Sequence, residues 1–74
     1  MKLSSRNQIK GKIVDIVKGP IMAKIKIDIG GGNNLTSVIT GDAANEMNLM
    51  VGDEIVAVIK ATSIMLGKSG RSDK

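Results

Sequence analysis

Apolar and polar residues alternate most regularly in residues 21–29. Every second position there holds isoleucine or alanine, and the positions between them hold methionine, lysine and aspartate. A period of two with one apolar face predicts a half-buried strand. The glycines and asparagines of residues 30–34 tolerate positive φ and predict a turn. Residues 35–40 then predict a second strand, which completes a hairpin.

Residues 7–18, upstream of this hairpin, predict another strand, since five of them are isoleucine or valine. Gly11 interrupts the alternation there, which indicates a bulge or a tight bend in the chain. Gly19 and Pro20 follow and mark the end of the strand. The first half of the chain therefore predicts three strands joined by short turns.

The second half predicts one short helix and two more strands. Residues 42–49 predict the helix, with Asp42 as its N-terminal cap, and residues 51–53 predict a turn. Residues 54–61 and 63–66 predict strands. Five short strands, with one short helix between the third and the fourth, predict an all-β fold, a small OB-like Greek-key barrel.

The strand predicted at residues 54–61 differs from the others because both of its faces are apolar. An antiparallel strand normally exposes one face to water. Two interpretations stay open: another subunit covers the second face, or the strand is central and its own chain wraps it. We expect the domain to span residues 1–67. Residues 68–74 hold glycine, serine and charged residues, and we expect them to form a disordered tail.

Composition limits how so small a domain can be stabilised. The chain has 74 residues, and a domain of this size buries only about 60% of its unfolded surface. Such domains usually need disulfides, a metal or oligomerisation. Cysteine and histidine are absent, which excludes disulfides and the commonest zinc sites. Self-association is the remaining source of stability.

The same composition argues against several kinds of protein. No apolar stretch approaches the roughly 18 residues that cross a membrane, and the first eight residues contain no apolar signal core, so we expect a cytoplasmic protein without membrane contact. Without histidine or cysteine, and with scattered carboxylates, the chain offers no base or nucleophile for catalysis. The sequence therefore predicts a binding protein rather than an enzyme.

The net charge of +4, from 11 basic and 7 acidic residues, favours an anionic partner. Nucleic acid, acidic lipid surfaces and small oxyanions all fit this description. OB-type barrels often bind single-stranded nucleic acid, but such sites stack bases on aromatic side chains. The chain has no aromatic residue, so we expect no nucleic-acid partner, although this alternative stays open.

Two polar clusters combine a cation with hydroxyl groups. One precedes the first predicted strand and the other ends the strand with two apolar faces: Ser4, Ser5, Arg6 and Asn7, then Lys60, Ala61, Thr62 and Ser63. Charge-assisted hydrogen bonds are roughly twice as strong as neutral ones, so either cluster suits a doubly charged oxyanion. The residues alone leave a second interpretation open, a solvated chain end and a lysine that extends to water.

These clusters resemble parts of the Mop domain, also called TOBE, a module that binds molybdate. That family opens with Ser-Ala-Arg-Asn, and residues 4–7 of this chain read Ser-Ser-Arg-Asn. Residues 35–40 resemble the family's third strand, residues 51–55 the turn before its fourth strand, and residues 58–66 its ending. The resemblance covers residues 3–66, and a free-standing domain of this length is similar to the molbindins.

The resemblance implies a homo-oligomer, a hexamer arranged as a trimer of dimers. It implies that molybdate or tungstate is bound between subunits for storage or buffering, without an organic cofactor. The implied ligand residues, with Thr40 reaching in from a neighbouring subunit, are Ser4, Ser5, Arg6, Thr40, Lys60, Ala61 and Thr62. A second site at the trimer axis would lie near residues 19–21. A regulatory role beside a separate transport or transcription partner also stays open.

Overall fold

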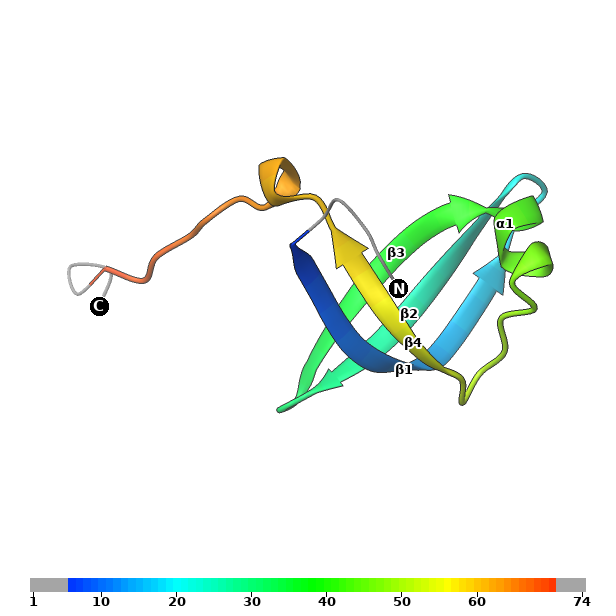
Figure 1. Cartoon of the computed structure of the whole chain (residues 1–74), viewed down its shortest axis with the longest axis horizontal. Coiled ribbons are helices and arrows are strands. Elements are labelled where there is room, and N and C mark those ends of the chain that lie inside the picture. Colours follow the sequence, from blue (N-terminus) through cyan, green and yellow to red (C-terminus); the bar gives the residue numbers. More distant parts are fainter. Residues whose placement is uncertain (1–5, 71–74) are drawn as a thin grey trace.

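Four strands and one short helix make up the computed structural model, which describes residues 6–70 (Figure 1). A short 3-10 turn, η1, follows the last strand. The elements in chain order are β1 (Asn7–Lys18), β2 (Met22–Gly30), β3 (Asn33–Thr40), α1 (Gly41–Glu46), β4 (Glu54–Ile59) and η1 (Ala61–Ser63). The predicted all-β fold, with one helix between the third and fourth strands, is confirmed.

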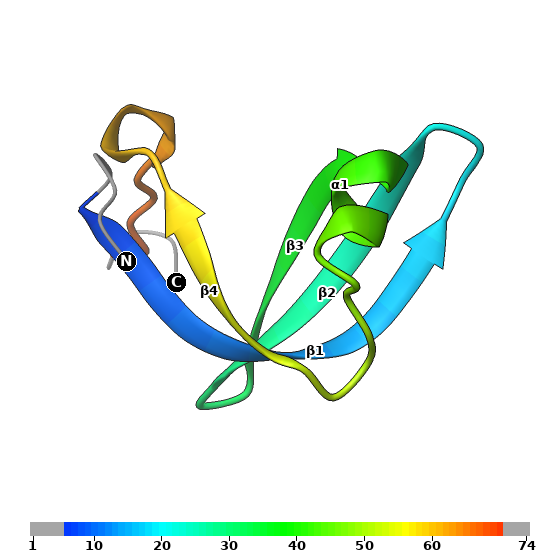
Figure 2. The same ribbon diagram turned by 45° about the vertical axis from the view of Figure 1, so that its right-hand side comes forward.

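The strands form one antiparallel sheet in the order β3-β2-β1-β4. β1 pairs with β4 through its first half and with β2 through its second half. It changes partner at Lys12, which lies opposite both Asp28 and Glu54. The sheet bends along β1, so its two halves form the V seen in Figure 2. This curvature makes a small OB-like barrel that is open between its edge strands, β3 and β4.

The alternation in β2 builds the core. Ala23, Ile25 and Ile27 are buried on its inner face, and Ile13 of β1 and Ala44 of α1 pack with them. The side chains between them are exposed. The strand predicted at residues 21–29 is therefore confirmed with a shift of one residue at each end.

Gly11 does not hold the predicted bulge. The pairing of β1 with β2 shifts between Ile13 and Asp15, so the extra residue of the bulge lies between these two. Gly11 lies instead where two strands approach closely. A Cβ added there would be 2.5 Å from Ile27 Cγ2 and 2.9 Å from the backbone oxygen of Asp28. Only a residue without a side chain fits this position.

The helix begins one residue earlier and ends three residues earlier than predicted. Its N-terminal cap is Thr40, whose Oγ1 accepts a hydrogen bond from the Ala43 N–H at 3.1 Å. Asp42 lies in the first turn, so its predicted capping role is wrong. At the other end, Asn48 has a φ of 52°, and a left-handed residue commonly ends a helix.

β4 lies at an edge of the sheet, which excludes one of the two interpretations of this strand and leaves its coverage by another subunit a prediction. Ile55, Ala57 and Ile59 are half-buried, whereas Val58 is exposed. Its own chain pairs with one side of β4 only, so the interpretation as a central, wrapped strand is wrong. The strand ends two residues earlier than predicted because Lys60 is the N-terminal cap of η1.

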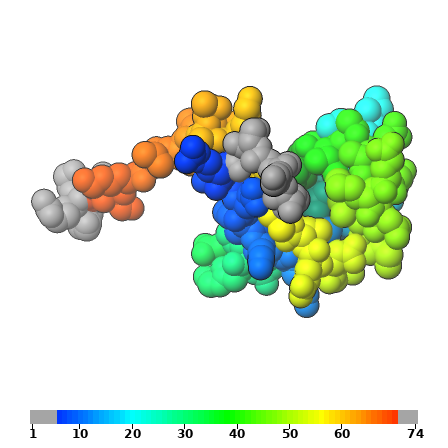
Figure 3. Space-filling model, viewed as in Figure 1, coloured from blue at the N-terminus to red at the C-terminus, as the bar shows by residue number. Residues whose placement is uncertain are grey.

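The predicted fifth strand at residues 63–66 is also wrong. Residues 64–70, which we call the C-terminal arm, have no regular structure. A strand needs a partner edge, and within residues 6–70 no strand pairs with this segment. The arm extends away from the barrel (Figure 3). The radius of gyration is accordingly 14.6 Å, whereas a compact domain of this length has about 11 Å.

Candidate functional site

The two predicted cations lie at the same end of the molecule, which we call the cation end. β1 begins there and β4 ends there, with Asn7 opposite Ile59 (Figure 1). Arg6 and Lys60 are therefore the next positions outward on two paired strands. Both residues are exposed. The fold thus brings together two residues from opposite ends of the sequence.

The carboxylates of β1 and β4 lie far from the cation end. Glu54 pairs with Lys12 at the other end of this ladder, about 17 Å away at 3.3 Å per residue, and Asp15 lies further along β1. Like charges at opposite positions of two strands repel each other. An anion bound between Arg6 and Lys60 would remove this repulsion.

The turn η1 adds backbone donors beside Lys60. The Ser63 N–H donates to the Lys60 carbonyl at 2.9 Å, and the Ile64 N–H donates to the Ala61 carbonyl at 3.4 Å. The N–H groups of Ala61 and Thr62 precede these bonds, so η1 itself gives them no acceptor. Three of the predicted residues therefore present a cation, two N–H groups and a hydroxyl on one exposed turn.

The remaining predicted residues are not at the cation end. Ser4 and Ser5 lie outside the described residues. Thr40 ends β3 beside α1, on the other limb of the V (Figure 2). One chain therefore does not bring Thr40 to Arg6 and Lys60, and its entry from a neighbouring subunit stays a prediction.

The turn between β1 and β2, predicted to lie near a second site, offers few donors. The Gly19 N–H already donates to the Met22 carbonyl at 2.8 Å, and Pro20 has no N–H. The Ile21 carbonyl accepts from the Gly41 N–H at 2.7 Å, which ties this turn to the start of α1. The second site therefore stays a prediction with little support from this turn.

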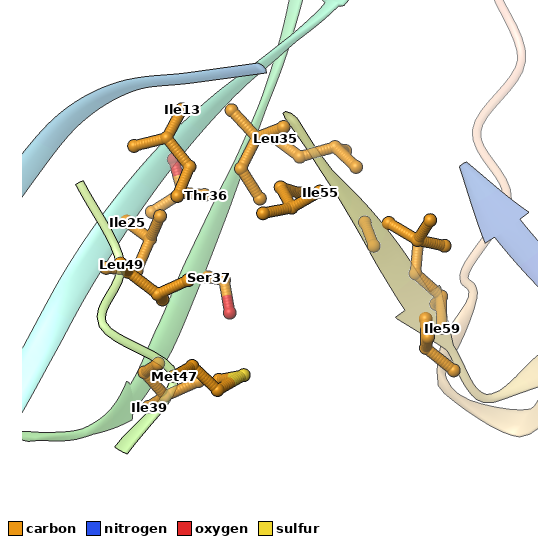
Figure 4. A pocket seen from close by; sticks show the side chains of 14 residues that line it. Ile13, Ile25, Leu35, Thr36, Ser37, Ile39, Met47, Leu49, Ile55 and Ile59 are labelled. Atoms are coloured by element: carbon orange, nitrogen blue, oxygen red, sulfur yellow. The ribbon is translucent and has the colours of Figure 1, made fainter. Parts of the chain in front are cut away.

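An apolar groove opens between β3 and β4 (Figure 4). Its volume is 440 Å³, and residues of both edge strands line it together with Met47 and Leu49 from the segment after α1. Among residues 6–70, only Thr36 and Ser37 are polar residues that line it. Such a surface suits an apolar segment and not a dianion. The sequence signal for it was the apolar character of both faces of residues 54–59.

Charges of both signs alternate across the outer face of the sheet. Lys12 lies opposite Asp28 and Glu54, and Lys26 lies opposite Asp15. Proteins that bind single strands without sequence preference use a positively charged groove that follows the backbone. The paired part of β1 with β2 and β4 has no such continuous basic stripe.

Residues 6–70 contain neither a cluster of metal ligands nor a helix that could span a membrane. No group of three or more aspartate, glutamate, histidine or cysteine residues there could hold a metal ion. The helices of the same part of the chain are too short or too polar to cross a membrane.

Comparison with known proteins places this geometry in a family. The model of the TOBE domain matches residues 3–66. A probable molybdenum-pterin-binding protein of Haemophilus influenzae is 55% identical over 67 residues, which cover 90% of this chain and 97% of that protein.

Two solved structures share the fold. A molybdate binding protein from Sporomusa ovata has a TM-score of 0.86 at 40% identity, over 92% of this chain and all of that chain. The cytoplasmic molybdate-binding protein ModG, solved with molybdate bound, has a TM-score of 0.78 at 41% identity, over 82% of this chain and 43% of its own. The family match and these likenesses cover nearly all described residues, and the chain is a member of the TOBE domain family.

Proposed function

We propose that this chain binds molybdate or tungstate between its own copies, without an organic cofactor, and catalyses no reaction. The observation that carries the proposal is the placement of Arg6 and Lys60 at neighbouring strand ends, with the carboxylates of those strands far away. The named ligands of the similar proteins, molybdenum-pterin and molybdate, identify the class of anion.

The chemistry of the cation end fits a small dianion. Molybdate is fully ionised at neutral pH, so a site must replace its hydration with donors. Arg6 offers a planar fork of N–H groups and Lys60 a compact charge. The N–H groups of Ala61 and Thr62 add donors without adding charge. Each bond to the ionised ligand is charge-assisted and therefore strong.

A second copy of the chain would complete the site, because Thr40 lies on the other limb of the V. The surface also favours self-association. The chain exposes 6161 Å², whereas a compact monomer of this mass exposes about 4,400 Å². The difference is about twice the roughly 800 Å² that each partner buries in a standard protein–protein interface. We propose a hexamer arranged as a trimer of dimers.

Binding between copies links the ligand to assembly. An oxyanion that binds only the assembled form stabilises it by mass action, and water excluded from the contact strengthens each electrostatic interaction. Such a protein would store or buffer the anion in the cytoplasm and release it as the free concentration falls.

Calorimetric titration of the purified chain with molybdate, tungstate, sulfate and phosphate tests this function. We expect saturable binding of the first two anions and a particle mass several times that of one chain. A monomeric protein, or one that ignores molybdate and tungstate at millimolar concentration, would overturn the proposal.

Two substitutions test the residues of the site. Lys60→Ala and Arg6→Ala each remove a charge-assisted bond, so we expect molybdate affinity to fall about ten- to a hundred-fold. Lys24→Ala is the matched control, since Lys24 is an exposed lysine of β2 that lies opposite Val17 and Val38. If Lys24→Ala weakens binding as much as Lys60→Ala does, the cation end is not the site.

A further inference from the structure

The methionines are the only readily oxidised side chains of this protein. The chain has five of them and no cysteine, tryptophan, tyrosine, phenylalanine or histidine. Buried methionines usually fill gaps in a core, but Met22, Met47, Met50 and Met65 are all exposed. Exposed thioethers are open to oxidation by peroxides, which makes their positions worth following.

Two of these methionines lie on the apolar surfaces that self-association would cover. Met47 is 60% exposed and lines the groove between β3 and β4 (Figure 4). Met65 is 92% exposed in the C-terminal arm, between the apolar residues Ile64 and Leu66. Met50 is 57% exposed, nearly as much as Met47, but it does not line the groove.

The arm of a second copy is the occupant that suits the groove. Ile64 has extended backbone angles, φ −92° and ψ 121°, so the arm already begins in the conformation of a strand. Leu66 is 94% exposed, and burying such side chains drives association. The turn η1 directs the arm away from its own barrel (Figures 1 and 3). The groove in turn presents two edge strands and almost no polar side chain.

We propose that Met47 and Met65 are oxidation sites of the separated chain, at which peroxide prevents reassembly, an inference that rests on the proposed function. A peroxide transfers one oxygen atom to the thioether sulfur, which loses two electrons and becomes a sulfoxide. The other peroxide oxygen leaves as water, or as an alcohol if the peroxide is organic. No further reactant is needed.

The sulfoxide changes the contact because it is polar. Burying a polar group without a hydrogen-bond partner is unfavourable, and the groove offers only Thr36 and Ser37 as polar side chains. The oxidised surfaces therefore stay in water, and the oxidised chains do not reassemble. Because the oxyanion lies between copies, chains that stay separate do not hold it. Peroxide would thus lower the capacity of the store.

Two double variants of the full chain separate this effect from general oxidation. Each is oxidised by hydrogen peroxide in urea, so that all remaining methionines react, and then refolded. In Met47→Leu/Met65→Leu, the methionines at positions 22 and 50 are oxidised, and both lie outside the groove and the arm. In Met22→Leu/Met50→Leu, the methionines at positions 47 and 65 are oxidised, and these lie in the groove and in the arm. Leucine is close to methionine in volume and is tolerated well. Mass spectrometry counts the added oxygens, and native mass spectrometry gives the size of the particle.

We expect the oxidised wild type and the oxidised Met22→Leu/Met50→Leu variant to lose the assembly and run as single chains. The oxidised Met47→Leu/Met65→Leu variant should keep the mass of the untreated protein. Retention of the assembly by the oxidised wild type, or equal loss in both double variants, would overturn the inference. A single-chain mass before any oxidation would overturn the proposed function itself.

A variant that needs no oxidant covers the case in which oxidised protein fails to refold. Met47→Gln with Met65→Gln places a polar group at both positions. Circular dichroism should show the same β content as the wild type, and native mass spectrometry should show single chains. An assembly of wild-type size would contradict the inference.

Discussion

The two limbs of the V differ in how far one chain completes them. At the α1 end, the helix is capped by Thr40, the Gly41 N–H donates to the Ile21 carbonyl, and Lys18 Nζ donates to Asn45 Oδ1 at 3.1 Å. The cation end instead leaves two like charges side by side and an apolar arm in solvent. The first limb stabilises the fold, and the second is where we propose that another molecule binds.

This difference separates residues that hold the chain together from residues that bind. Substitutions in the core and at the α1 end should lower the free energy of unfolding whether or not a ligand is present. Substitutions at the cation end should lower affinity and leave the ligand-free stability nearly unchanged. Four substitutions test this separation, in order of decreasing expected effect on the free energy of unfolding.

Ile13→Ala should have the largest effect on stability. Ile13 is the largest fully buried side chain among the described residues, and truncating a buried isoleucine costs about 2–5 kcal/mol. Urea denaturation followed by circular dichroism measures the loss. Val38→Ala, at an exposed residue of β3 that does not line the groove, is the control. If Ile13→Ala unfolds at the same urea concentration as the wild type, the core around Ile13 is not what stabilises the chain.

Gly11→Ala should destabilise by about 1–3 kcal/mol, since overpacking forces backbone shifts of that cost. The added Cβ would meet the Asp28 backbone oxygen at 2.9 Å, and backbone cannot move aside as a flexible side chain can. Gly67→Ala is the control, because no atom lies within 4 Å of a Cβ added there. The same urea titration compares the two, and equal midpoints would contradict the close approach seen at Gly11.

Thr40→Ala removes the helix cap and should cost about 1 kcal/mol. Thr40→Ser keeps the oxygen that accepts from Ala43 and should recover most of the loss. Thermal denaturation of ligand-free protein measures both. A serine variant as unstable as the alanine variant would show that the methyl group, and not the cap, matters.

Lys60→Ala should have the smallest effect on the ligand-free fold, within about 0.5 kcal/mol as for most surface substitutions. Relief of the repulsion from Arg6 favours a slight gain. The same variant should lose most of its molybdate affinity. A large loss of ligand-free stability would show that Lys60 supports the fold, which would break the comparison between the two limbs.

The four observed strands could be predicted because the signal of each is local: alternation in β2, and isoleucine and valine residues in β1 and β4. The predicted strand at residues 63–66 was wrong because pairing depends on a partner edge, which periodicity does not reveal. Asp42 was mistaken for the cap because both it and Thr40 are good capping residues, and only the backbone angles at Thr40 decide where the helix begins. At Lys12, β1 passes from pairing with β4 to pairing with β2. This arrangement, which brings the strands close at Gly11, is likewise a property of the whole sheet.

The residues of the proposed site could be named from the sequence, but the neighbouring placement of two of them could not. Arg6 and Lys60 were singled out by their chemistry and by the family resemblance. Their neighbouring placement follows from the pairing of Asn7 with Ile59, which no local pattern contains. The groove also escaped prediction, because it exists only where β3 and β4 fail to meet.

The cap on α1 has a consequence for anion selectivity. A threonine hydroxyl has one proton to donate and two lone pairs that accept, and the Thr40 oxygen already accepts from the Ala43 N–H. In the site that we propose, its proton would point to the ligand and favour an oxygen that carries no proton. Inorganic phosphate keeps a proton near neutral pH and molybdate does not, so the residue that caps a six-residue helix would then favour one of two anions of the same shape.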